Sequence, residues 1–387
     1  MSRSELALAA LALLSGLSFA AVTPTLPLYV ERLGASYQAL GLFFSAYSLT
    51  WSVLQLYTGY LSDRYGRRRL ARIGLAIYGL SALACAWAGN FSQLLAFRIL
   101  QGIGLGLLGP ALLGLVAGLK HPGRAFALYR TAQVAGEVIG PVAGGMVGMF
   151  GLGKPFLLSA GASGLALGAT FLLGEEMAGG ERETKTGFLA AARAMFSRRG
   201  FLLLGLGTFL AEMGYVARGV AVPLAGEAVG LSTGQIGLVM SAYSLVFILS
   251  QVPIGALVRA GRVEEWKSGR VDRKPLLVGC ALLGALGFGG LSLATSAWQM
   301  GAAMSVLGLA LGTIFVQSAA WAAELAPAER QSLYLASFDT LIDLSFPLTP
   351  LLVGPLFGLG VRLPFLLCTA LLFLSAGVLW RVPDRPQ

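Results

Sequence analysis

Long apolar runs alternate with short polar segments from one end of the chain to the other. Most runs hold about twenty residues and almost no charge, the length that an α-helix needs to cross the hydrocarbon of a bilayer. Each run therefore predicts a membrane-spanning helix, and the whole pattern predicts an all-α membrane protein with twelve transmembrane helices. The expected spans are residues 5–30, 37–61, 70–89, 92–118, 124–150, 154–174, 200–226, 231–258, 275–296, 298–323, 330–357 and 363–381.

Composition agrees with a membrane location for the whole chain. Of the 387 residues, 56% are hydrophobic and 12% are charged, whereas soluble domains average about 25% charged residues. The 53 glycines fit membrane helices, in which small residues allow two backbones to approach closely. No polar stretch is long enough to form a separate soluble domain.

Basic residues concentrate on one side of the expected membrane. The net charge is +10, and most of the 28 Lys and Arg residues lie at the two termini or in the loops after even-numbered spans. This asymmetry follows the positive-inside rule and predicts that both termini are cytoplasmic. A surface that binds nucleic acid would not change sides with every helix, so we expect no nucleic-acid partner.

Residues that usually bind metals or form disulfides are few and scattered. Cys85, Cys280 and Cys368 all lie in expected spans, and His121 has no second His or Cys nearby to complete a metal site. No nucleophile–base pair stands out either. We therefore expect no metal, no cofactor and no enzymatic activity.

Two segments that lie six spans apart repeat the same sequence. Residues 41–61 (GLFFSAYSLTWSVLQLYTGYL) and residues 237–257 (GLVMSAYSLVFILSQVPIGAL) are identical at 10 of 21 positions, at an offset of 196. Six spans preserve orientation, so the repeat predicts two pseudo-symmetric six-helix bundles related by an axis along the membrane normal. We expect them at residues 1–174 and 200–387. The segment between them, 175–199, is expected to be either a plain cytoplasmic linker or an amphipathic helix on the membrane surface.

A charged motif follows the second expected span. Residues 59–68 read GYLSDRYGRR and resemble the signature loop of the major facilitator superfamily, G-x-L-x-D-R-x-G-R-R, at every defining position. A simple charged turn would explain the arginines but not Asp63 between two glycines. We expect Asp63 at the N-terminus of the third span, where the helix dipole favours an anion. The resemblance implies a gating role for Gly59, Asp63, Arg64, Gly66, Arg67 and Arg68.

Two motifs inside spans resemble the same superfamily. Residues 98–104 read RILQGIG, similar to the family's R-x-x-Q-G motif. Residues 136–145 read GEVIGPVAGG and resemble the G-x-x-x-G-P-x-x-G-G motif of the exporting antiporter branches, including the drug:proton antiporters. Plain helix packing is an alternative explanation for the glycines. The cavity-lining or structural residues expected within spans are Arg98, Gln101, Gly102, Arg130, Gly136, Gly140, Pro141, Gly144 and Arg218.

The resemblance covers the whole chain and implies a mode of action. It implies two six-helix domains around a central cavity that opens alternately to each side of the membrane. Spans 1, 4, 7 and 10 would line the cavity, and spans 2, 5, 8 and 11 would help to gate it. In the second half, an insertion displaces the acidic residue of the signature loop to Asp272, so that copy departs from the family's pattern and carries no expected gating role.

Four carboxylates fall inside expected spans, where charge is costly and usually functional. A low dielectric favours the neutral form of a carboxylic acid, so such a group can gain or lose a proton as its surroundings change. Glu137 and Asp343 are related by an offset of 206, and each stands four residues before a proline. Salt bridges with the intramembrane arginines are the alternative role. The candidates for proton coupling are Glu137, Asp343, Asp339 and Glu212.

Aromatic residues in several spans are candidates to line a cavity for lipophilic ligands, although each taken alone is more often a packing or lipid-facing residue. They are Tyr47, Trp51, Tyr215, Tyr243, Phe247, Phe315 and Trp321. We therefore expect a proton-coupled exporter of hydrophobic or amphipathic small molecules that works as a monomer among the lipids of the inner (plasma) membrane. The alternatives are an exporter of lipid-like or anionic amphiphiles, a proton symporter for a nutrient, and a non-transporting receptor or scaffold on the same fold.

The orientation can be tested with single cysteines in a chain whose native cysteines are replaced. A cysteine near Asn90 or near Gly230 should react with an impermeant thiol reagent in intact cells, because both positions fall in expected outer loops. A cysteine near Ser268 should react only after the membrane is opened. Labelling of the Ser268 position in intact cells would reverse the assigned orientation.

Overall fold

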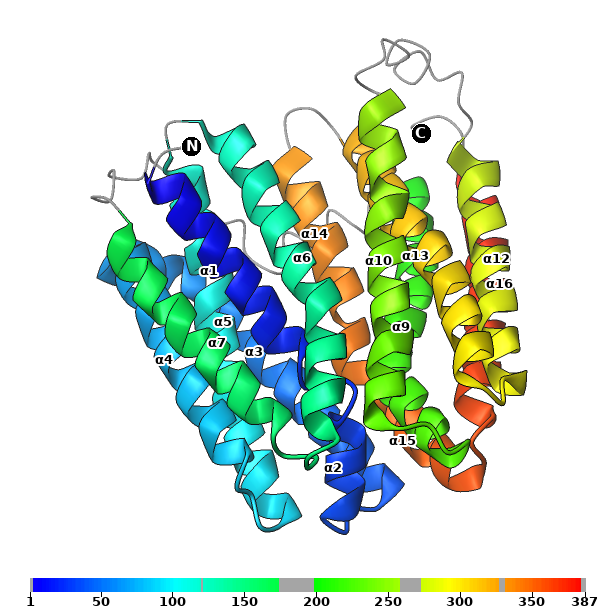
Figure 1. The fold of residues 1–387 in the computed structure, drawn as a ribbon. Coiled ribbons are helices and arrows are strands. Elements are labelled where there is room, and N and C mark those ends of the chain that lie inside the picture. The colour runs from blue at the N-terminus through cyan, green and yellow to red at the C-terminus, as the bar shows by residue number, and fades with distance from the viewer. Residues whose placement is uncertain (1–2, 120, 174–197, 258–272, 327–330, 384–387) are drawn as a thin grey trace. The chain divides into compact units, whose positions relative to one another are not determined.

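Helices account for all regular structure in the described part of the chain (Figure 1). The computed structural model describes residues 3–119, 121–173, 198–257, 273–326 and 331–383. The helices of the first half are α1 (Arg3–Ala20), α2 (Leu26–Arg32), α3 (Tyr37–Tyr65), α4 (Arg67–Cys85), α5 (Phe91–Ala117), α6 (Pro122–Gly148), α7 (Pro155–Ala169) and η1 (Thr170–Leu172). Those of the second half are α9 (Arg199–Ala228), α10 (Thr233–Leu257), α12 (Arg273–Leu293), α13 (Ala297–Leu325), α14 (Gln331–Asp343), α15 (Ser345–Leu359) and α16 (Leu363–Trp380).

Each expected span coincides with one helix or with two consecutive helices. In the described residues, 8 helical segments are long and apolar enough to cross a membrane, judged by length and composition. The chain is therefore a multi-pass helical protein. The full count of twelve crossings and the side on which the termini lie stay predictions.

The first expected span divides into two helices near Pro24. α1 ends at Ala20, four residues before this proline, and α2 begins at Leu26. A proline ring clashes with the carbonyl four residues earlier and has no N–H to donate, which ends the helix at Ala20. The Thr23 hydroxyl donates to the Ala20 carbonyl at 2.7 Å and satisfies that group.

The eleventh expected span also divides, and here the break adjoins a candidate carboxylate. α14 ends at Asp343 and α15 begins at Ser345. Asp343 stands four residues before Pro347, so its carbonyl is the one that the proline ring displaces. The related sequence in the first half behaves differently, because α6 runs without a break through Glu137 and Pro141. One repeated pattern thus gives a broken helix in one half and a continuous helix in the other.

The helices group into two compact units. The first comprises residues 1–182 and 222–241, and the second comprises residues 183–221 and 242–387. The end of α9 and the beginning of α10 therefore belong with the first unit. The expected linker, residues 175–199, lies outside the described residues except for its last two positions.

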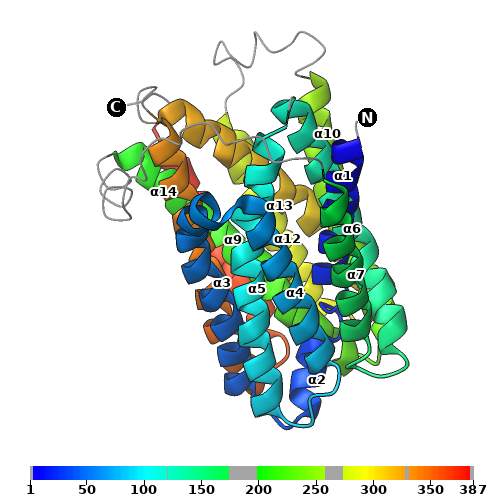
Figure 2. The same ribbon diagram turned by 90° about the vertical axis from the view of Figure 1, so that its left-hand side faces the viewer.

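In the first unit, α5 lies between α3 and α4 (Figure 2). Gly74 on α4 and Gly104 on α5 bring two backbones together, since a Cβ on Gly104 would come within 2.7 Å of the Tyr78 nitrogen. The Thr58 hydroxyl on α3 donates to the Gly106 carbonyl on α5 at 2.7 Å. Small residues and a buried hydroxyl thus hold three helices at close range, as is common in membrane bundles.

One contact between a glycine and a tyrosine backbone occurs in both units. A Cβ on Gly102 of α5 would lie 2.9 Å from the Tyr47 carbonyl oxygen of α3. A Cβ on Gly308 of α13 would meet the Tyr243 carbonyl oxygen of α10 at 2.5 Å. The two glycines are related by the offset of 206 and the two tyrosines by the offset of 196. Repeat-related residues therefore make the same helix contact in both units.

The glycine-rich motif on α6 is a packing surface for two helices. Gly136, Gly140 and Gly144 recur every four residues and face α1 and the residue after it. A Cβ on Gly136 would overlap the backbone of Leu13 and Leu17, and a Cβ on Gly140 or Gly144 would overlap Ala20 or Ala21. Gly145 faces the beginning of α10, and the Thr233 hydroxyl donates to its carbonyl at 2.9 Å. Close packing against α1 and α10 accounts for these glycines.

Replacing Gly144 with alanine should destabilise the protein, because the new methyl group would collide with the Ala21 carbonyl oxygen. Overpacking of this kind typically costs about 1–3 kcal/mol, and the melting temperature in detergent should fall accordingly. Gly164→Ala on α7 is the matched control, because no atom lies within 4 Å of the position that its Cβ would take. Equal melting temperatures for the two variants would show that α1 and α6 can move apart without lowering the stability of the protein.

Candidate functional site

Each unit holds an arginine stacked on a repeat-related tyrosine. In the first unit, the guanidinium carbon of Arg98 on α5 lies 3.9 Å from the ring centroid of Tyr47 on α3 and 5.9 Å from that of Phe43. Arg98 is buried, with 4% of its surface exposed. Its Nη1 donates to Oε1 of Gln101, which lies one turn further along α5. The R-x-x-Q-G motif thus packs against the tyrosine of the repeated segment.

In the second unit, Arg218 on α9 lies over two tyrosines. Its guanidinium carbon is 3.8 Å from the ring centroid of Tyr243 on α10 and 4.3 Å from that of Tyr215 on α9. Tyr243 is the repeat partner of Tyr47. The same tyrosine position is therefore covered by an arginine from the fourth expected span in one half and from the seventh in the other.

Stacking alone does not compensate for burying a guanidinium group. A cation–π contact contributes about 0.5–2 kcal/mol, whereas moving an ion out of water costs several kcal/mol even after the protein relaxes. Within the described part of the chain, neither Arg98 nor Arg218 forms a salt bridge with a carboxylate. The remaining compensation comes from hydrogen bonds, such as that from Arg98 to Gln101, and from charges at longer range.

Glu212 supplies negative charge near Arg218, and Asp343 lies near Glu212. Glu212 on α9 interacts electrostatically with Arg218 and with Asp343 at the end of α14. Both acids are partly buried. The structure therefore groups two of the four candidate carboxylates with an arginine. The separation of Glu212 and Arg218 by six residues on one helix did not predict this grouping.

Beside Arg218, a group of aromatic rings lies within the second unit. Tyr243 stacks on Phe247 of α10 with 5.5 Å between ring centroids, and Phe247 lies 6.2 Å from Phe315 of α13. Tyr215 lies 6.2 Å from Phe346 of α15. Four of these residues were expected from the sequence to line a cavity, and Phe346 was not. The aromatic cluster is defined as Tyr215, Tyr243, Phe247, Phe315 and Phe346.

The other two candidate carboxylates lie apart from this grouping. Asp339 on α14 is exposed. Glu137 on α6 belongs to the first unit, is partly buried, and interacts electrostatically with Tyr129. Arg130, also on α6, is exposed and donates to Gln133 at 3.1 Å. The offset of 206 therefore relates Glu137 to Asp343 in sequence while the two belong to different units.

The signature loop joins α3 to α4 through a single residue. α3 continues through Asp63 to Tyr65, so the backbone of Asp63 belongs to the last turn of α3. The sequence had predicted Asp63 at the start of the next helix, and for the backbone that prediction is wrong. No helix-breaking residue stands between Asp63 and Gly66, which explains why the helix persists. Gly66 has φ 87°, a conformation that glycine adopts without strain. The side chain of Asp63 lies outside the described part of the structure.

The arginines of this loop contact the ends of α3 and α5. Arg67, the first residue of α4, donates to the Gly114 carbonyl on α5 at 2.8 Å. Arg64 is exposed, with its guanidinium carbon 5.5 Å from the ring centroid of Tyr65. Arg68 is partly buried on α4. The loop therefore ties the end of α5 to the start of α4, and Gly59 lies two turns earlier on α3.

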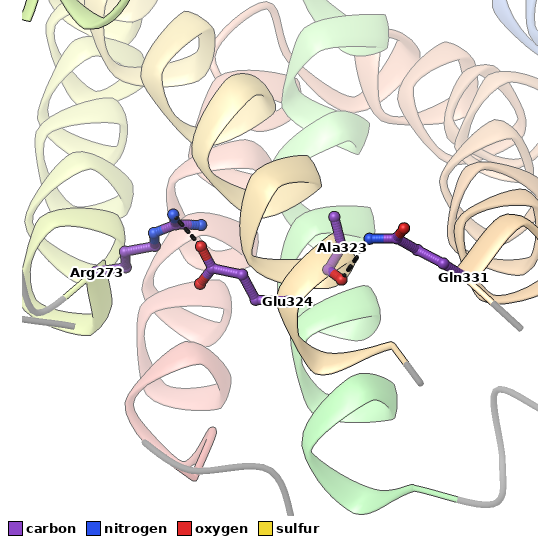
Figure 3. Close-up of polar contacts among 4 residues, drawn as sticks. All are labelled: Arg273, Ala323, Glu324 and Gln331. Carbon is purple, nitrogen blue, oxygen red and sulfur yellow. Dashed lines mark hydrogen bonds and ion pairs between the residues drawn. The ribbon is translucent and has the colours of Figure 1, made fainter. Parts of the chain in front are cut away.

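The second unit has a related contact at the corresponding helix ends. Arg273, the first residue of α12, pairs with Glu324 near the end of α13 (Figure 3). Arg273 is the counterpart of Arg67 at the offset of 206. Gln331 at the start of α14 donates to the Ala323 carbonyl at 2.9 Å and joins a third helix to the same end of α13. The insertion in the second-half loop therefore leaves this arginine contact in place.

Comparison with known proteins identifies the family. The model of the Major Facilitator Superfamily matches residues 8–217 and 204–387, which together cover nearly the whole chain. The chain belongs to the major facilitator superfamily. Membership of this superfamily indicates a membrane transporter.

Two relatives of known name match parts of this superfamily member. The quinolone resistance protein NorA of Staphylococcus aureus is 30% identical over 147 residues, which cover 37% of this chain and 38% of NorA. The multidrug resistance protein B homolog of Mycobacterium tuberculosis is 33% identical over 190 residues, which cover 47% of this chain and 33% of that protein. The chain thus matches less than half the length of either relative.

Solved structures of transporters share the fold along the entire chain. A mutant of the nucleoside transporter NupG superposes with a TM-score of 0.83 at 12% identity, covering 98% of this chain and 99% of that one. A bacterial homolog of the human lysosomal transporter Spinster gives 0.78 at 13% identity, with 98% and 96% covered. A D-xylose-proton symporter gives 0.72 at 19% identity, with 100% and 99% covered. These likenesses show the major facilitator fold.

The two arginine–tyrosine stacks are the main features that sequence reasoning missed. The repeated SAYSL segment marks both tyrosines, and the R-x-x-Q-G motif marks Arg98, so each partner was visible separately. Their meeting depends on how α3, α5, α9 and α10 are rotated about their own axes. That rotation is a property of helix packing and is not readable from the spacing of residues along one helix.

Proposed function

We propose that this superfamily member is a proton-coupled exporter of hydrophobic or amphipathic small molecules. The observation that carries the proposal is the grouping of Glu212 and Asp343 with Arg218, beside the aromatic cluster. Glu212 interacts electrostatically with both Asp343 and Arg218, so the charge of this arrangement changes when a single proton binds. Proton coupling requires such a group inside the membrane.

The chemistry of the grouping follows from competition for Arg218. When Glu212 or Asp343 is ionised, the guanidinium is attracted towards the carboxylate. When an acid is protonated, that attraction is lost and the aromatic faces of Tyr215 and Tyr243 hold the cation. Each protonation step therefore changes the balance of forces on α9, α10 and α14. The break between α14 and α15 beside Asp343 gives this part of the chain a place to bend.

The aromatic cluster supports a lipophilic substrate. Ring faces contribute large apolar contact areas and tolerate ligands of different shape. The names of the two relatives, a quinolone resistance protein and a multidrug resistance protein, support the same substrate class and the exporting direction.

A second candidate function is the export of lipid-like or anionic amphiphiles. Arg218 favours it, because the guanidinium lies against the aromatic cluster and forms no salt bridge with the described carboxylates. An anionic head group beside Arg218 with an apolar tail over the rings would satisfy both features. Transport assays with matched cationic and anionic amphiphiles distinguish the two candidates.

The proposal places the protein in a bacterial-type inner membrane with both termini in the cytoplasm, acting as a monomer. The concentration of basic residues at the termini and in alternate loops supports that orientation. Protons are the proposed coupling ion, and the partners are the substrate and the surrounding lipids.

Neutralising either acid of the grouping should uncouple transport from the proton gradient. Glu212→Gln and Asp343→Asn should each abolish uptake driven by a pH gradient in proteoliposomes, yet retain substrate exchange, because an amide mimics the shape of a protonated carboxyl. The double variant should be no worse than either single variant if the two acids share one proton, since residues that act as a unit are not additive.

Glu227→Gln is the matched control, because this acid lies on the same helix as Glu212, is half exposed, and pairs with Arg32 at 3.7 Å. It should keep gradient-driven transport. Glu137→Gln and Asp339→Asn complete the set of candidate acids. Gradient-driven transport in all four single neutralisations would contradict carboxylate-based proton coupling and favour a uniporter or another coupling ion.

Asp63→Asn should impair transport while leaving expression and folding nearly intact. The signature loop joins α3 to α4 through Gly66, and Arg67 ties it to α5, so a charge change there alters the balance between inward-open and outward-open states. A shift of about 1.4 kcal/mol changes the ratio of the two states tenfold. Arg69→Gln, an exposed position on α4 directly after the loop, is the control. A wild-type transport rate in the Asp63→Asn variant would show that the loop only sets the orientation of the chain in the membrane.

A further inference from the structure

α14 packs one face against α9 and exposes an acid on another. The rings of Tyr334 and Phe338 have their centroids 5.0 Å and 6.0 Å from that of Phe201 on α9. Both side chains are buried. Among the described side chains of α14, only Gln331 at its first position and Asp339 are exposed. The one exposed side chain in the interior of this helix is therefore a carboxylate.

Other helices of the same unit expose nonpolar residues instead. Every exposed residue of α12 and of α16 is nonpolar, with Leu286 and Phe373 as large examples. Such surfaces suit contact with lipid, whereas a charged side chain within a span faces the interior of the bundle or water. Asp339 lies eight residues after Gln331, about 12 Å into the expected span at the rise of an α-helix. The exposed surface of α14 at Asp339 therefore faces water and not lipid.

The charge of Asp339 is not balanced within the described part of the chain. None of the salt bridges formed there includes this residue, and no other charged group of that part interacts with it. Neighbouring protein atoms nevertheless desolvate the carboxylate. Arg218 of the same unit differs, because Glu212 lies near it. Of these two charges, the one that lacks a counterpart is the negative charge of Asp339.

The acid lies a short distance along the chain from the aromatic cluster. Phe346 of that cluster is seven residues further on, which corresponds to about 10 Å along a helix axis. Leu344, between α14 and α15, keeps helical backbone angles of φ −62° and ψ −19°. Positions seven residues apart on a helix share a face. An amphipathic molecule about 10 Å long can therefore contact the rings with its apolar part and Asp339 with its charged end.

We propose that Asp339 binds the positively charged group of the substrate, so that the exported compounds are amphipathic cations such as lipophilic amines and quaternary ammonium ions. This inference rests on the proposed function and narrows its substrate class. Charge complementarity carries it, because the exposed carboxylate lacks a cation and the adjacent ring faces also attract cations. Asp339 is then a substrate-binding residue, and Glu212 and Asp343 keep the role in proton coupling.

Two ions of the same shape and opposite charge test this proposal without any proton gradient. Tetraphenylphosphonium is a cation, and tetraphenylborate is an anion of nearly equal size. The wild-type full-length protein, purified in detergent, should bind radiolabelled tetraphenylphosphonium at equilibrium. Asp339→Asn should weaken that binding about tenfold through the loss of one close charge pair. The affinity for tetraphenylborate, measured by competition, should not fall in this variant.

Two further variants separate the charge from other effects of the substitution. Asp339→Glu keeps the carboxylate and should bind tetraphenylphosphonium within about threefold of the wild-type affinity. Glu227→Gln is the matched control, because it also removes one negative charge, from an acid that pairs with Arg32 away from α14. It should leave the affinity for both ions unchanged.

Several results would overturn the proposal. Wild-type affinity for tetraphenylphosphonium in Asp339→Asn is one, and equal weakening of both ions is another, because it would indicate a structural role. A wild-type protein that binds only tetraphenylborate would favour the anionic candidate. Binding of neither ion would contradict the lipophilic substrate class and with it the proposed function. If instead only proton coupling is wrong, the charge-selective loss in Asp339→Asn persists while transport ignores the gradient.

Discussion

Polar groups inside hydrocarbon have no water to bind, and this constraint governs most of the arrangement described here. Backbone groups meet it by forming helices, which satisfy every N–H and C=O within one segment. Hydroxyl side chains meet it by bonding to carbonyls of their own helix, as Ser48 does with Phe44 and Thr208 with Leu204. Arginine is harder to accommodate, because five donors and a full charge need partners at once. In each unit an arginine lies over one of the two repeat-related tyrosines, Tyr47 or Tyr243, but the other groups around the arginine differ.

The comparison between the two halves separates what the repeat preserves from what it leaves free. The contact of Gly102 with the Tyr47 backbone and that of Gly308 with the Tyr243 backbone are equivalent, because a backbone approach requires only a missing side chain at one position. The charges are not equivalent. In the second unit Glu212 lies near Arg218, while in the first unit Arg98 contacts the neutral side chains of Gln101 and Tyr47. A common framework of helices therefore carries two different electrostatic sites.

Motifs that resemble functional signatures also have structural reasons to exist. The glycines of the α6 motif pack against α1 and the beginning of α10, and a methyl group at Gly144 would overlap the Ala21 carbonyl. Arg67 of the signature loop and Arg273 of its second-half relative both tie the start of one helix to the end of another. Such contacts do not exclude a role in transport, because gating surfaces are themselves packing surfaces that form and separate.

Much of the fold followed from the sequence alone. The positions of the helices depend on local quantities, since about twenty apolar residues suffice to make a helix that spans hydrocarbon. Membership of the superfamily followed from a ten-residue loop and a repeated segment. The charge distribution predicted an orientation that the structure does not test.

Tertiary structure decided which residues meet. The sequence placed Glu137 and Asp343 at equivalent positions of the two halves, but the structure sets Asp343 near Glu212 and sets Glu137 near Tyr129. It also broke the helix at Asp343 while α6 continued through Glu137, although both acids stand four residues before a proline. The physical reason is that hydrophobicity fixes only that a segment lies in the membrane. Which side chains contact one another depends on how several helices rotate and cross. The close packing of small residues on all of these helices sets that geometry, so no single segment determines it.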